Sequence, residues 1–122
     1  MILTIKATNI ERTARILGRI DTICAKLEKF APAADPDELR VKIEIGRITR
    51  HHRKGIVYRA EINVTLSGIA LRAKAAGGDV ITALDEARDE IERRLLKAKR
   101  KSVSVKHREG VAMKAVRRGE RT

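Results

Sequence analysis

Three carboxylates in the C-terminal half of the sequence are spaced so that they could act together in acid–base chemistry. Asp85, Asp89 and Glu92 follow one another at intervals of four and three residues, which places them on one side of a helix. Paired carboxylates serve as general acid and base when a substrate lies between them. Here basic residues are interleaved with them, as on a solvated helix face, and no histidine or thiol is placed as a partner. We therefore expect a protein that is not an enzyme and takes no small-molecule substrate.

The histidines and the single cysteine are the candidates for metal binding. His51 and His52 are adjacent, so on a strand or hairpin their side chains point to opposite sides, and the basic neighbours in residues 50–55 repel a cation. That loop is either an exposed basic tip that touches RNA or a solvent-facing loop. Cys24 is the only cysteine, so no internal disulfide and no four-cysteine site can form. Its place in an apolar helical stripe favours a small core residue. We expect no metal and no cofactor.

Basic charge near the C-terminus is the strongest chemical signal. The formal charge is +12, and residues 93–122 hold twelve Lys and Arg against two acids, whereas residues 1–92 hold sixteen against fourteen. Concentrated positive charge attracts a polyanion by displacing its counterions. A tail that only aids solubility is the alternative. Phe30 and Tyr58 are the only aromatic residues, which argues against a base-stacking platform.

Hydrophobic periodicity indicates the elements that must position these charges. Two-residue alternation predicts strands at 2–8, 41–48, 58–66 and 69–75, and spacings of three and four predict helices at 13–30 and 79–101. Thr13 and Asp79 are the expected N-caps. Gly46 breaks the alternation before Ile48, which predicts a bulge or twist there. Beyond residue 101 the periodicity is lost, so we expect one domain at 1–101 and a basic, disordered tail at 102–122.

The order β-α-β-β-β-α predicts an α+β fold. Each helix has one apolar face, so both can cover one face of a four-stranded sheet, giving a two-layer sandwich whose other face is open to solvent. No apolar run approaches the roughly 18 residues that span a bilayer. The N-terminus lacks the pattern of a signal peptide. We expect a protein of the reducing cytoplasm with no membrane contact.

Four strings occur in order along these elements, at residues 5–11, 26–30, 78–85 and 89–101. With the element order, they resemble the ribosome hibernation-promoting factor and ribosome-associated inhibitor family, also called sigma-54 modulation proteins, over roughly residues 2–101. The resemblance implies a sandwich similar to double-stranded RNA-binding domains. It also implies a protein that binds the small ribosomal subunit between head and body, covers the mRNA and tRNA sites and keeps idle ribosomes silent.

The same resemblance implies an rRNA-binding surface on the exposed sides of the two helices. Its residues would contact phosphates as positioning contacts rather than read bases. They are Arg19, Lys26 and Lys29 on the first helix and Arg93, Lys97, Arg100 and Lys101 on the second. The family usually has an aromatic residue where this chain has Ile81. Only 21 residues follow Lys101, too few for the dimerisation domain of long-form members, so we expect a short form that is monomeric off the ribosome.

Two other interpretations remain open. One is a different ribosomal or ribosome-assembly protein that uses the same sandwich to bind RNA. The other is a protein-interaction module that uses the open face of the sheet. That face would present Lys42, Glu44, Arg59, Glu61, Asn63 and Thr65, whose mixed charges are typical of a solvated sheet face.

Overall fold

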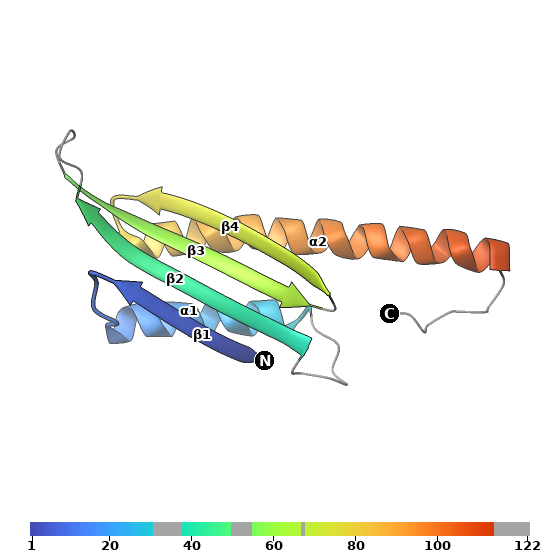
Figure 1. Cartoon of the computed structure of the whole chain (residues 1–122), viewed down its shortest axis with the longest axis horizontal. Coiled ribbons are helices and arrows are strands. Elements are labelled where there is room, and N and C mark those ends of the chain that lie inside the picture. The colour runs from blue at the N-terminus through green and yellow to red at the C-terminus, as the bar shows by residue number, and fades with distance from the viewer. Residues whose placement is uncertain (31–37, 50–54, 67, 114–122) are drawn as a thin grey trace.

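The computed structural model describes residues 1–30, 38–49, 55–66 and 68–113, with residues 49 and 100–113 described by their backbone alone. Six elements follow in the expected β-α-β-β-β-α order (Figure 1). They are β1 (Ile2–Thr8), α1 (Ala14–Glu28), β2 (Leu39–Thr49), β3 (Ile56–Leu66), β4 (Ile69–Gly77) and α2 (Val80–Met113).

The four strands form one mixed sheet in the order β1-β2-β3-β4. β1 runs parallel to β2, while β2–β3 and β3–β4 are antiparallel, so β1, β2 and β4 all point the same way. α1 returns the chain from β1 to β2, and α2 turns back directly after β4. Both helices therefore run against these three strands and parallel to each other, and Figure 1 shows them starting at the same end of the sheet.

The core is aliphatic and lies between the sheet and the two helices, which confirms the predicted two-layer sandwich. Ile20, Leu27, Ile43, Ile62 and Leu84 are among its fully buried side chains. Among the described residues no polar or charged residue is buried. Burying this much aliphatic surface on one face of a sheet is the main stabilising contribution to such a fold.

The expected N-cap of α1 is confirmed. The Thr13 side chain accepts a hydrogen bond from the Ile16 backbone N–H at 3.2 Å, and the Asp79 carboxylate accepts one from the Thr82 N–H at 3.3 Å at the start of α2. Each oxygen satisfies one of the N–H groups that have no partner in a first helical turn. These caps fix where the two parallel helices begin.

Of the bulge or twist predicted at Gly46, the bulge is wrong. The β2–β3 ladder continues residue for residue through this point, with Ile45 opposite Ala60, Gly46 opposite Arg59 and Ile48 opposite Val57. The shift in the apolar pattern has another cause. Ile48 and Val57 form a cross-strand pair on the open face, so the apolar residue changes face while the backbone stays regular.

The expected tail began at Ser102, whereas the backbone of residues 102–113 continues α2. The backbone of α2 is helical to Met113, and the helix projects past the sheet (Figure 1). Among its side chains that are described, which end at Lys99, Leu95 is the last buried one. Extending a formed helix adds a hydrogen bond for each residue fixed and needs no new nucleus. The rest of the expected tail, residues 114–122, lies outside the described residues. In the part of the chain that is described, no helix is long and apolar enough to cross a bilayer.

Both free edges of the sheet carry an arginine. The Arg12 guanidinium donates to the Ile5 carbonyl oxygen on β1 at 3.0 Å, and Arg94 donates to the Arg72 carbonyl oxygen on β4 at 3.0 Å. Unpaired edge carbonyls are sites where another strand can add, and a charged side chain on the edge opposes that. Arg94 thus has a structural role on β4.

Candidate nucleic-acid interface

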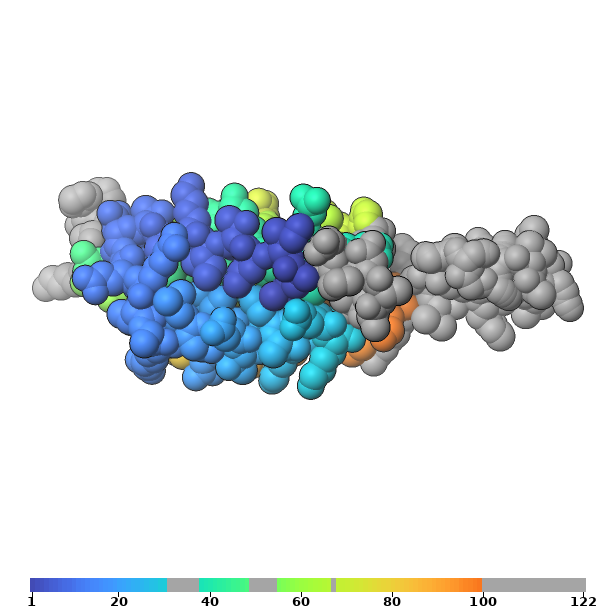
Figure 2. Space-filling view, turned by 90° about the horizontal axis from the view of Figure 1, so that it is seen from below, coloured from blue at the N-terminus to red at the C-terminus, as the bar shows by residue number. Residues whose placement is uncertain are grey.

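The parallel course of the helices brings their C-terminal ends to one end of the molecule. α1 ends with Lys26 in its last turn and Lys29 as its C-cap, and the basic run of α2 lies at the same end. Figure 2 shows the cyan end of α1 and the orange part of α2 at this shared end. We call Lys26, Lys29, Arg93, Lys97 and Lys99 the basic end. The cations on α1 also complement the negative end of its dipole, so part of this pattern is structural.

Three of the predicted contact residues are exposed and uncompensated. Lys26, Lys29 and Lys97 have exposed side chains, and none forms an ion pair with another described residue. Arg93 is 71% exposed but pairs with Glu90 one turn earlier. The side chains of Arg100 and Lys101 lie outside the described residues, although their backbone continues α2.

Arg19 differs from the other predicted contact residues. Its guanidinium donates to both carboxylate oxygens of Asp85 at 3.1 Å, which joins α1 to α2 across 66 residues of sequence. The pair is partly exposed, at 38% and 31% of the two side chains. Arg19 therefore holds the helices together, and its charge is already balanced by a carboxylate.

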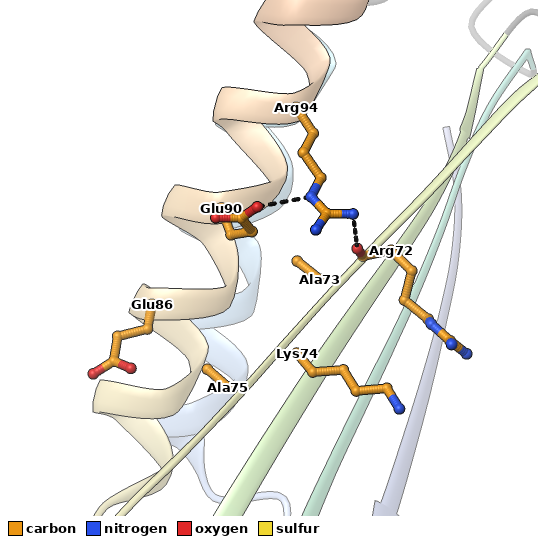
Figure 3. A pocket seen from close by; sticks show the side chains of 7 residues that line it. All are labelled: Arg72, Ala73, Lys74, Ala75, Glu86, Glu90 and Arg94. Atoms are coloured by element: carbon orange, nitrogen blue, oxygen red, sulfur yellow. Dashed lines mark hydrogen bonds and ion pairs between the residues drawn. The ribbon is translucent and has the colours of Figure 1, made fainter.

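Lys99 was not among the predicted contact residues, but it is exposed and has no ion pair within the described residues. The signal for it was present, because it lies in the same basic run as Lys97. Arg94 is also in this run but is engaged. It donates to Glu90 at 2.7 Å and to the β4 edge, as Figure 3 shows.

Two of the three carboxylates that could have formed an acid–base group are engaged by different arginines. Asp85 pairs with Arg19, and Asp89 accepts a 2.8 Å hydrogen bond from Arg88, which holds the pKa of Arg88 above its usual value. One carboxylate oxygen of Glu92 is buried and has no hydrogen-bond partner among the described residues.

A hollow of about 590 Å³ lies between β4 and α2 (Figure 3). Ala73 and Ala75 form its apolar part, and Glu86, Glu90 and Arg94 line its helix side. Arg94 and Glu90, which both line the hollow, neutralise each other's charge in an ion pair. No group of three or more metal-ligating side chains occurs in the described parts of the chain. The His51 and His52 loop lies outside the described residues.

Cys24 is a buried core residue, as expected. Burial in α1, reinforced by the charges of Asp21 and Glu28, raises the pKa of its thiol to about 11. The thiolate is the reactive form, so the native thiol stays protonated and unreactive at neutral pH.

We expect Cys24 to react with a disulfide reagent such as Ellman's at pH 8 far more slowly in the native protein than in urea. The raised pKa leaves only about one thiol in a thousand ionised at that pH, and burial restricts access further. Absorbance at one pH, with and without denaturant, measures both rates. Equal rates in the two conditions would contradict the buried placement of this thiol.

The comparisons with known proteins identify the family from the sequence and support the fold from solved structures. Residues 3–103 match the family model described as "Sigma 54 modulation protein / S30EA ribosomal protein". The structure is similar to the Protein Y N-terminal domain of Thermus thermophilus, with a TM-score of 0.63 and 24% identity over 78% of this chain and 96% of that one. It is also similar to a ribosomal subunit interface protein of Coxiella burnetii, with a TM-score of 0.61 and 20% identity over 81% and 98% of the two chains. At these identities the solved structures support the fold.

Proposed function

Because this chain belongs to the Sigma 54 modulation protein / S30EA ribosomal protein family, we propose that it silences idle ribosomes by binding the small subunit and covering the groove where mRNA and tRNA bind. The family is ribosome-associated and non-enzymatic, which confirms the expectation that the protein is not an enzyme. We place the ribosome-binding domain at residues 1–101 and the protein in the cytoplasm, as a monomer when it is off the ribosome.

The basic end is the observation that carries this proposal. Lys26, Lys29 and Lys97 come from two helices and present uncompensated charge at one end of the molecule. Lys and Arg that contact phosphates fix a protein's position on RNA without reading bases. A surface of this kind supports binding to folded rRNA, where shape and charge decide the site. The protein would then act by sterically blocking the groove where mRNA and tRNA bind.

The test is co-sedimentation of the purified chain with small subunits across a salt series, with initiator tRNA as competitor. We expect binding that weakens steeply with salt and is lost when tRNA fills the groove. Steep salt dependence follows from the counterions that phosphate contacts release. Large subunits are the control and should not pellet the protein. Salt-sensitive binding that tRNA does not displace would place the protein at another ribosomal site, and absence of binding would refute the proposal.

Arg19 and Lys26 should respond differently to the same substitution. We expect Lys26→Ala to lower the slope of log affinity against log salt by about 1, since it removes one phosphate contact. Arg19→Ala should leave the slope unchanged, because Asp85 already balances its charge at 3.1 Å. Arg19→Ala should instead lower the free energy of unfolding, by less than about 1 kcal/mol, as is usual for a partly exposed ion pair. Binding titrations and urea melts of both variants measure the two effects, and equal salt slopes would contradict the assignment.

A further inference from the structure

The open face of the sheet carries more positive charge than its sequence suggests. The strand registers place six cations on this face, distributed over all four strands: Lys6, Arg40, Lys42, Arg59, Arg72 and Lys74. All six are exposed. The only acids that the same registers bring to this face of the described strands are Glu44 and Glu61.

The two carboxylates on this face are poorly exposed, and each pairs with a more exposed cation. The Glu61 side chain is 14% exposed and pairs with Arg72 at 3.5 Å, while Arg72 itself is 60% exposed. The Glu44 side chain is 28% exposed and pairs with Lys42 at 3.5 Å, with Lys42 at 51%. The carboxylates are therefore less exposed than the cations they pair with, and the charge that this face presents to solvent is positive.

Four cations on this face have no carboxylate partner among the described residues. They are Lys6, Arg40, Arg59 and Lys74. Each comes from a different strand. Strands lie about 4.8 Å apart and alternate side chains about 6.7 Å apart along a strand, so the charges form a two-dimensional array. Such an array can contact several phosphates of one RNA backbone at once.

The face offers little to a protein partner. It carries no aromatic residue, and its one strongly exposed large apolar residue, Ile2, lies at the start of the edge strand β1. Protein interfaces depend on aromatic or apolar anchors at their centre. On this face Ile2 lies at the edge, and Ile48 and Val57 are only partly exposed. Where Gly46 has no side chain, a hollow of about 400 Å³ opens beside Arg59 and Thr8. This gives an anionic group room to approach the Arg59 guanidinium.

We propose that the open sheet face is a second RNA-binding surface, which contacts the sugar–phosphate backbone of rRNA through Lys6, Arg40, Arg59 and Lys74. This inference rests on the proposed function and extends it. The helices cover the opposite face of the same sheet, so the protein would contact rRNA on two sides and bridge two parts of the subunit. The sheet thus acts as a binding layer as well as a scaffold for the helices.

The test compares two variants that lose the same charge. Arg40→Gln/Lys74→Gln removes two unpaired cations from the sheet face and leaves both Glu ion pairs intact. Arg12→Gln/Arg15→Gln removes two exposed cations outside both surfaces. For the first we expect at least about a tenfold loss of affinity for small subunits near 0.1 M salt, and a salt slope lower by about 2. For the second we expect affinity close to that of the unaltered protein.

The outcomes separate this inference from the function on which it rests. If the sheet-face variant binds like the control variant while the unaltered protein binds normally, the second surface is refuted and the proposed function stands. Lost affinity with an unchanged salt slope would also refute it, since phosphate contacts must change the slope. Failure of the unaltered protein to bind would overturn both. Thermal melts must show that both variants are folded.

A crosslink identifies the partner of this face. Thr65 is exposed and lies opposite Arg40 in the ladder, so Thr65→Cys places a thiol for a photo-crosslinker among the cations. Buried Cys24 stays unlabelled under native conditions. We expect a crosslink to rRNA from position 65, and none from the control Ala14→Cys at the start of α1. A crosslink from position 65 to ribosomal proteins alone would overturn the assignment to RNA.

Discussion

Binding to the small subunit should be abolished when four basic residues of α2 are reversed to glutamate, namely Arg93, Lys97, Arg100 and Lys101. The substitution removes four cations and adds four anions along α2, two of them within the basic end. Loss of four phosphate contacts alone lowers affinity by roughly a thousandfold near 0.1 M salt, and repulsion from the added carboxylates lowers it further. Co-sedimentation in low salt measures the loss.

The matched control for this variant exchanges lysine and arginine at the same four positions. It keeps every charge, so it should retain most of the salt-dependent binding, although the shapes of the donors change. Both proteins should show the same helical circular dichroism, because all four residues follow Glu92, and of the side chains described beyond that point only Leu95 is buried. A folded glutamate variant that still pellets with the small subunit would show that the contact surface lies elsewhere.

Ile91→Ala should lower the free energy of unfolding by about 2–5 kcal/mol, a large part of the stability of a small domain. Ile91 is fully buried, and it fixes the part of α2 that leads into the basic end onto the sheet. Truncation removes apolar contacts and leaves a cavity that the surrounding side chains fill only in part. Urea denaturation measures the change as a lower midpoint with an unchanged m value.

Leu96→Ala is the control for this substitution, because it removes the same amount of hydrocarbon five residues further along the same helix. Leu96 is 41% exposed, so its truncation should cost much less, about 1 kcal/mol or below. Similar losses in both variants would mean that α2 packs on the sheet through a different face from the one described.

The sequence alone predicted the elements, the caps and the composition of the core. Alternation in residues 2–8 and 58–66 predicted strands that the structure contains, and Thr13 was identified as the N-cap of α1. These features depend on neighbours within one or two turns or on the two-residue repeat of a strand, so the local pattern is sufficient. The pattern failed at Gly46, because a change of face and a bulge give the same shift in periodicity.

The concentration of charge near the C-terminus was also set by the sequence, but which charges are available was decided only by the tertiary structure. Arg19 looked equivalent to Lys26 until the packing of α1 against α2 placed Asp85 beside it, 66 residues away. The sheet face looked mixed until the β3–β4 register placed the poorly exposed Glu61 beside Arg72. An ion pair depends on the distance between two side chains, and for residues far apart in the chain only the packing of elements and the register of strands fix that distance.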